Sequence, residues 1–273
     1  MTIKSVEEDF LFVKKKISKL FEISLNRDKD NLRSYLLYVY GPVTDYVESV
    51  LSLTKIGKIN AAKVILRTLV EVHIKINYYQ IDDSKSDSYR KLAIAGKVDF
   101  DNKIKTVNEF SKLIQKHPSL INYSLGDLYN TEGQQKMISH AKSRRDIVLN
   151  FNNATESDVE LNLVDMAMKC DEANSSINTE GSFLHMYTLL YRYLSPVVHL
   201  SIEGLDHFFE SDDKNNVVFK VKDESSDVNE TAVDIWLALV KDLFEKKVLL
   251  GDFPKEVADL EENLKKGVYN QST

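Results

Sequence analysis

The chain has 273 residues, of which 43% are hydrophobic, and it carries a net charge of −6 at pH 7. A chain of this length and apolar content can bury a substantial core, so we expect a folded globular protein. The acidic balance argues against a protein that coats DNA or RNA, because such proteins bind phosphates through an excess of Lys and Arg. The single cysteine, Cys170, excludes an internal disulfide and a cysteine-based zinc cluster.

Only 9 Gly and 4 Pro are present, too few for the many turns of a β-sandwich or β-barrel. We therefore predict an all-α fold, a multi-helix bundle that forms a single domain over residues 1–273 with loop insertions at about 81–102, 117–133 and 211–228. The sequence shows no signal-peptide pattern and no apolar stretch near the roughly 20 residues that span a bilayer. We expect a cytoplasmic protein without a membrane partner.

The first 80 residues predict three helices. Apolar residues recur at three- and four-residue steps over residues 6–23, 31–53 and 61–80, as one face of a helix requires. We expect the second helix to be interrupted at Gly41 and Pro42, because a proline lacks the N–H of a helical hydrogen bond. The third is apolar around most of its circumference, which predicts a central position in the bundle.

One polar stripe crosses that third helix. Its members follow one another at four-residue steps and share one face: Lys63, Arg67, Glu71 and Lys75. Two interpretations are open. Either the stripe forms an exposed ladder of ion pairs, which contributes little to stability, or Arg67 and Glu71 face a polar pocket shared with residues from later in the chain.

The middle of the chain predicts three shorter helices: Ser86–Ala95, Lys103–Lys116 and Gln134–Asn150. A loop at 96–102 is expected between the first two. Residues 152–157 are the best candidate for an internal loop, and Thr155 or Ser157 is expected to cap a helix that continues to Cys170.

Two short basic runs, Lys14–Lys16 and residues 142–145, are candidates for contact with RNA. A short run of charge on a helix more commonly forms a solvated face, and this is the interpretation that we favour.

Residues 183–194 have the apolar spacing of a helix, and this helix carries Arg192. Because Pro196 lacks the N–H that would bond the carbonyl of Arg192, the helix is expected to end or kink near Ser195. Ser195 then serves as the N-cap of a new helix that starts at Pro196.

The C-terminal part adds one strand and two helices. Apolar and polar residues alternate over 215–222, which predicts a short strand, either in a small β-hairpin insertion over the bundle or paired with a partner subunit. A long helix is predicted over Thr231–Leu249 with Trp236 facing inward, and a last amphipathic helix follows Pro254.

The expected break near Ser195 brings two chemically useful side chains towards one region. His199 would lie about one turn into the new helix, where free backbone N–H groups and the helix dipole bind anions and favour a neutral imidazole. Arg192 adds a permanently charged fork that suits phosphate. Together these groups indicate phosphodiester chemistry, although on the residues alone a capping or packing role for His199 is the more common one.

Arg192, six intervening residues and His199, late in an all-helical chain, resemble the motif of the HEPN superfamily (higher eukaryotes and prokaryotes nucleotide-binding), in which four to six residues separate Arg and His. Arg67-x3-Glu71 and Ser195-x3-His199 also resemble an uncharacterised bacterial family of helical proteins. Many HEPN proteins are metal-independent ribonucleases of toxin or anti-phage systems that act as dimers. The resemblance therefore implies a homodimeric endoribonuclease that acts on RNA without metal or cofactor, with an antitoxin or defence protein as a further partner.

In such an enzyme Arg192 would hold the scissile phosphate and stabilise its developing charge. His199 would move a proton to or from the attacking 2′-hydroxyl or the leaving oxygen. From the residues themselves we add Ser195 as a hydrogen-bond donor to phosphate, and Tyr191 or Tyr193 as a ring that stacks on a base.

Arg67 and Glu71 complete the predicted substrate-binding set if they share this pocket. The alternative from another class is a non-catalytic helical module that binds a protein or a nucleotide. In that case Arg192 and His199 only tie two helices together.

Overall fold

The computed structural model describes residues 5–24, 31–81, 85–118, 131–151, 154–175, 182–192, 194–195, 209–211, 217–219, 225–246, 248–249, 252–267 and 269. The chain forms two compact units, the first made of residues 1–78 and 163–273 and the second of residues 79–162. The prediction that all 273 residues form one domain stays a prediction. Within the described ranges no helix is long and apolar enough to cross a membrane.

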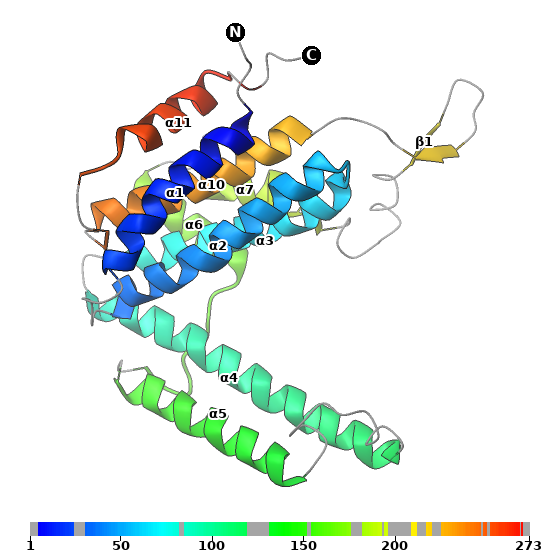
Figure 1. Cartoon of the computed structure of the whole chain (residues 1–273). Helices are drawn as coiled ribbons and strands as arrows, with labels where there is room; N and C mark the ends of the chain where they lie inside the picture. The colour runs from blue at the N-terminus through cyan, green and yellow to red at the C-terminus, as the bar shows by residue number, and fades with distance from the viewer. Residues whose placement is uncertain are drawn as a thin grey trace. The chain divides into compact units, whose positions relative to one another are not determined.

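The first unit is a helical bundle (Figure 1). Its elements are α1 (Val6–Ser24), α2 (Asn31–Lys55), α3 (Ile59–Gln80, whose last two residues belong to the second unit), α6 (Leu163–Asn174), α7 (Phe183–Met186), η3 (Tyr187–Arg192), β1 (Phe209–Ser211), β2 (Val217–Phe219), α10 (Ser225–Glu245) and α11 (Lys255–Lys265). The predicted all-α bundle is confirmed by this predominance of helix.

The core of the first unit surrounds α10. Trp236 is fully buried, and the Phe10 ring of α1 meets it edge-on with 4.9 Å between the ring centroids. The indole N–H donates to Thr44 Oγ1 of α2 at 3.0 Å, so the one polar atom of this side chain is paired. α10 therefore holds α1 and α2 in one core, and α11 packs against α1 and α10.

α2 passes through Gly41 and Pro42 without ending, so the predicted interruption is wrong. A proline inside a helix removes one backbone hydrogen bond and costs roughly 3 kcal/mol in an exposed helix. In α2, Val47 is fully buried in the core, and Thr44 Oγ1 donates to the Tyr40 carbonyl at 2.7 Å. Packing of this apolar face against α10 offsets the cost of the proline.

β1 and β2 form an antiparallel ladder in which Phe209 lies opposite Phe219 and Ser211 lies opposite Val217. β2 falls within the strand predicted at 215–222, whose other residues lie outside the described part of the chain. The loop insertion expected at 211–228 is shorter than predicted, because α10 already begins at Ser225.

The second unit is built on α4 (Lys85–Lys116) and α5 (Thr131–Phe151), two long helices that lie side by side (Figure 1). Gly96 of α4 lies against Val148 of α5, and Arg145 of α5 donates to Asp101 of α4 at 2.7 Å. Residues later in α4 thus meet residues earlier in α5, which makes the pair antiparallel.

The predicted loop insertion at 81–102, with a break at 96–102, is wrong because α4 is one continuous helix from Lys85. Glycine costs a helix about 1 kcal/mol relative to alanine. At Gly96 a Cβ atom would lie 3.5 Å from Val148 Cγ1, so α5 packs closely against this point. In the insertion predicted at 117–133, residues 119–130 lie outside the described residues, and α5 begins at Thr131.

Thr155 and Ser157 do not cap a helix, and that prediction is also wrong, because α6 begins only at Leu163. The polar groups of this segment instead satisfy one another. Asp158 Oδ2 accepts from the Thr155 N–H at 2.7 Å, and the buried Lys97 donates to the Asp158 carbonyl at 3.1 Å. These bonds accompany a turn over residues 155–158, in which the Asp158 N–H donates to the Thr155 carbonyl.

Candidate functional site

The segment that carries the predicted site starts at a buried helix cap. Asp171 of α6 is 1% exposed, and its two carboxylate oxygens accept from the backbone N–H groups of Phe183 at 2.6 Å and Leu184 at 2.9 Å. Ser182 Oγ accepts from the His185 N–H at 3.0 Å. These bonds satisfy three of the N–H groups that a helix start leaves without partners. The cap therefore fixes where α7 begins.

We expect Asp171→Ala to lower the free energy of unfolding by about 3 kcal/mol or more, because it removes two hydrogen bonds to a charged group, each of which contributes roughly 1.5–3 kcal/mol. Asp171→Asn keeps one acceptor oxygen and should lose less. Urea unfolding followed by circular dichroism measures both. Glu172→Ala, which removes an exposed carboxylate from the same helix, is the control with an expected change within about 0.5 kcal/mol. An equal effect of Asp171→Ala and Glu172→Ala would contradict the role of the cap.

Beyond the cap, the helix changes its hydrogen-bonding register. Phe183–Met186 is α-helical, whereas Tyr187–Arg192 is a π-helix, in which each N–H bonds the carbonyl five residues earlier. The prediction of one helix over residues 183–194 is therefore right about helical structure and wrong about an α-helical register at 187–192. π-Helical turns are rare and occur frequently at functional sites.

Arg67 of α3 reaches this π-helix with its guanidinium group. Nε donates to Ser195 Oγ at 3.1 Å, and Nη2 donates to the Tyr191 hydroxyl at 2.7 Å. The guanidinium carbon lies 4.1 Å from the centre of the Tyr191 ring, and Tyr187 stacks on Tyr191 with 5.3 Å between centroids. Hydrogen bonds and a cation–π contact attach one cation to two turns of the segment. The structure thus brings Arg67, Tyr191 and Ser195 together.

Each of the two interpretations of the polar stripe on α3 describes one part of it. Glu71 accepts from Lys75 at 2.9 Å, with about one third of each side chain exposed, as in an ion-pair ladder. Arg67 instead contacts the π-helix.

The pKa of the Tyr191 hydroxyl is raised above its ordinary value of 10. Burial is the largest cause and the negative charge of Glu71 the second, whereas the positive charge of Arg67 lowers this pKa. Tyr191 therefore stays protonated at neutral pH and remains able to donate a hydrogen bond.

Arg192 lies at the end of η3 and is exposed, and among the described residues no carboxylate forms an ion pair with it. Tyr193, Pro196 and His199 lie outside the described part of the chain. Leu194 and Ser195 are both α-helical, so the prediction that Ser195 is an N-cap is wrong. The end or kink of the helix near Ser195 and the convergence of Arg192 with His199 stay predictions.

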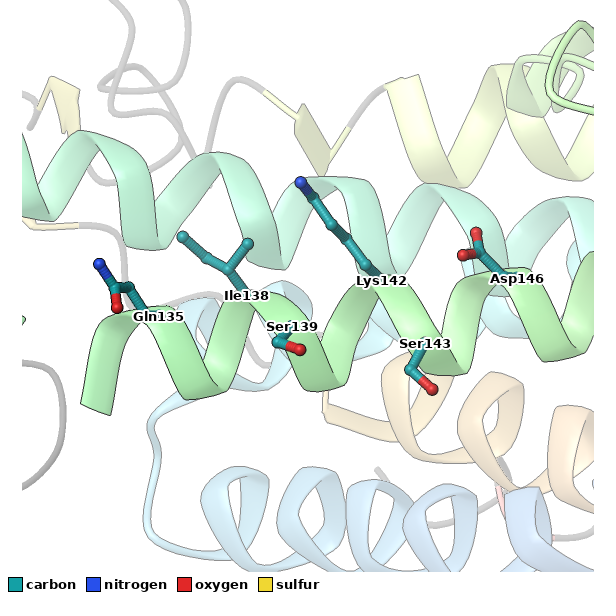
Figure 2. A pocket seen from close by; sticks show the side chains of 6 residues that line it. All are labelled: Gln135, Ile138, Ser139, Lys142, Ser143 and Asp146. Carbon is teal, nitrogen blue, oxygen red and sulfur yellow. The ribbon is translucent and has the colours of Figure 1, made fainter. Parts of the chain in front are cut away.

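A concave region of about 570 Å³ lies along one face of α5 in the second unit. Figure 2 shows its lining side chains on successive turns of this helix: Gln135, Ile138, Ser139, Lys142, Ser143 and Asp146. Lys142 and Asp146 are the charged members, and their opposite charges cancel. This concave region consequently has little electrostatic attraction for phosphate.

Carboxylates pair with three of the six cations in the two basic runs. In Lys14–Lys16 the first and last side chains bond to Glu48 and Glu256. Within residues 142–145, Arg145 is held by three carboxylates. These pairings agree with the interpretation of both runs as structural or solvated faces.

Comparison with protein families shows where the chain belongs. Residues 33–216, more than half of the chain, match the Family of unknown function (DUF5677). The chain belongs to this family. No curated protein and no solved structure is significantly similar to this DUF5677 protein. The predicted likeness to an uncharacterised helical family agrees with the match.

The matched region of this DUF5677 protein includes all of the predicted site residues, from Arg67 to His199, whereas α1, α10 and α11 lie outside it. Sequence reasoning missed two residues within it. Tyr187 is four residues before Tyr191, a spacing that places side chains together on a helix and could have indicated the stack. Asp171 carries no such local signal, because it caps a helix twelve residues away.

Proposed function

We propose that this DUF5677 protein is a metal-independent endoribonuclease related to the HEPN superfamily, with Arg192 and His199 as its catalytic pair. The observation that supports the proposal is the attachment of Arg67 to Tyr191 and Ser195, within the segment that leads to this pair. Guanidinium groups suit phosphate, and a cation that is already held in place needs little reorganisation when charge develops on a substrate. Arg192, which is exposed and belongs to this segment, supplies a second cation.

In the proposed reaction the 2′-hydroxyl of a ribose attacks the adjacent phosphorus, and the bond from phosphorus to the 5′-oxygen of the next nucleotide breaks. His199 takes the proton of the 2′-hydroxyl or gives a proton to the leaving 5′-oxygen. Arg192 neutralises charge on the non-bridging oxygens. The products are a 2′,3′-cyclic phosphate and a 5′-hydroxyl. Ser195 donates a hydrogen bond to phosphate, and Tyr191 or Tyr193 stacks on a base.

The biological setting follows from the same proposal. The enzyme acts in the cytoplasm as a homodimer, because dimers bring two Arg–His pairs together in the HEPN proteins that the motif resembles. A toxin or anti-phage role implies an antitoxin or defence protein that inhibits the ribonuclease activity.

Incubation of the purified protein with total RNA in EDTA tests the proposal. We expect the wild type to cut RNA to ends with 2′,3′-cyclic phosphate, and His199→Ala to leave the RNA intact. Arg192→Lys keeps the charge but loses the bidentate fork and should cut much more slowly. His185→Ala, which removes an exposed imidazole from α7, is the matched control and should retain activity. Intact RNA with the wild type, or equal cutting by His199→Ala, would overturn the assignment.

A non-catalytic helical module is the second candidate, and one observation favours it. Two of the donor groups of Arg67 are already used by Ser195 and Tyr191, so the guanidinium ties α3 to the π-helix. On this alternative the wild type and His199→Ala are equally inert towards RNA. A rise in Tm on addition of a nucleotide would then identify the module as a nucleotide binder.

A further inference from the structure

The π-helix is fixed at both ends by side chains from elsewhere in the first unit. At its N-terminal side Asp171 caps α7, and at its C-terminal side Arg67 binds Tyr191 and Ser195. Leu194, which lies between Tyr191 and Ser195 in the sequence, is 3% exposed and belongs to the core. The observed register therefore allows three things at once: the cap by Asp171, the burial of Leu194 and the hydrogen bonds of Arg67.

A change from π-helical to α-helical bonding would disturb all three. An α-helix turns by about 100° per residue, so removing the extra residue from one turn rotates everything downstream by about that angle. Leu190 and Leu194 would then take the positions of Tyr191 and Ser195. Arg67 would face two apolar side chains in place of its two hydroxyl acceptors. The contacts of Arg67 are thus compatible with the π register and incompatible with the α register.

We infer that Arg67 is a positioning residue, which holds η3 in the π register and so sets the direction in which Arg192 is presented. The inference rests on the proposed function, since it takes Arg192 and His199 to be the catalytic pair. Arg67 acts on the reaction through Tyr191 and Ser195, and it need not touch RNA.

The rival role is direct binding of substrate phosphate by Arg67. The positioning role requires the two hydroxyl groups that accept from Arg67, on Tyr191 and Ser195, whereas direct phosphate binding does not. Arg67→Ala removes the guanidinium, whereas the double variant Tyr191→Phe/Ser195→Ala removes both hydroxyl acceptors and leaves the guanidinium in place. If Arg67 only positions, removing it after its two acceptors are gone changes nothing further, so the triple variant is no worse than the double variant, which also lacks the hydrogen bond from Ser195 to phosphate. If Arg67 binds phosphate, the triple variant loses more activity than the double variant, because the loss caused by Arg67→Ala adds to it.

The activity assay uses a short oligoribonucleotide that contains a site cut by the wild type in total RNA. We expect kcat to fall about a hundredfold in Arg67→Ala, because small misplacements of reacting groups cause losses of this size, and by at least that factor in the double variant. The triple variant should match the double variant. Lys75→Ala, which removes a cation two turns further along the same stripe, is the matched control and should keep kcat within about twofold.

A second readout needs no RNA. Amide hydrogen exchange followed by mass spectrometry should show residues 187–195 exchanging roughly tenfold faster or more in Arg67→Ala and in the double variant, since each loses bonds to a charged group. Peptides from α10 should exchange as in the wild type. Lys75→Ala should leave residues 187–195 unchanged.

The outcomes separate the two proposals. If no protein cuts RNA but exchange at 187–195 rises as expected, the proposed function fails and the structural part of the inference stands without a catalytic role. If the wild type cuts RNA and the effects of the variants add, or if exchange at 187–195 is unchanged, Arg67 is not a positioning residue and the inference is overturned.

Discussion

Replacing Trp236 with alanine should lower the free energy of unfolding by about 3–5 kcal/mol, the usual cost of deleting a large aromatic side chain from a core. Trp236 is fully buried, it meets the Phe10 ring edge-on at 4.9 Å, and its N–H is bonded to Thr44. The substitution removes the contact between α1, α2 and α10 at one point. It also leaves a cavity that the surrounding helices fill only in part.

Urea unfolding followed by far-ultraviolet circular dichroism measures this change, since Trp236 is the one tryptophan of the chain and fluorescence would be lost with it. Trp236→Phe retains most of the ring volume and should be milder, with about 1 kcal/mol from the lost hydrogen bond. Tyr38→Ala provides the control, because this aromatic side chain of α2 is 74% exposed. A shift for Trp236→Ala no larger than that for Tyr38→Ala would contradict the central place of α10 in the core.

The helices that build this core could be predicted from the sequence because their periodic apolar faces are long. In α1, Phe10, Val13 and Ile17 recur at helical spacing and all are buried. The errors arose where a local signal was overridden by packing. Pro42 in α2 and Gly96 in α4 both read as helix breaks, but each lies in a helix whose apolar face is packed against another helix.

One part of the candidate site could be anticipated from the sequence, whereas its geometry could not. The four-residue stripe on α3 left Arg67 open between an ion-pair ladder and a pocket shared with residues later in the chain, and the structure places Arg67 in contact with Tyr191 and Ser195. The π-helical segment is contacted by Arg67, more than 120 residues earlier in the chain, and the helix before it is capped by the buried Asp171. Contacts of this range leave no periodic signal in a local stretch of sequence.

The second large effect concerns pH and His73, a buried residue of α3 that stacks on Phe183 of α7 with 5.4 Å between ring centroids. Burial lowers the pKa of its imidazole from 6.5 to about 4. Between these two values the unfolded chain binds a proton that the folded protein does not, so acid favours unfolding. The contribution of the neutral imidazole is fully present above pH 6.5 and is lost progressively as the pH falls to about 4. The total loss is about 3 kcal/mol.

Urea unfolding at several pH values between 7.5 and 4 measures this effect, with His73→Leu as the test variant. Carboxylates also change stability over part of this range, so the informative quantity is the difference between the two curves. Wild type should lose about 3 kcal/mol more than His73→Leu on acidification. His185→Ala, which replaces an exposed side chain of α7, is the control and should follow the wild-type curve. Parallel curves for wild type and His73→Leu would contradict the prediction, because they would show that the folded protein protonates His73 as readily as the unfolded chain does.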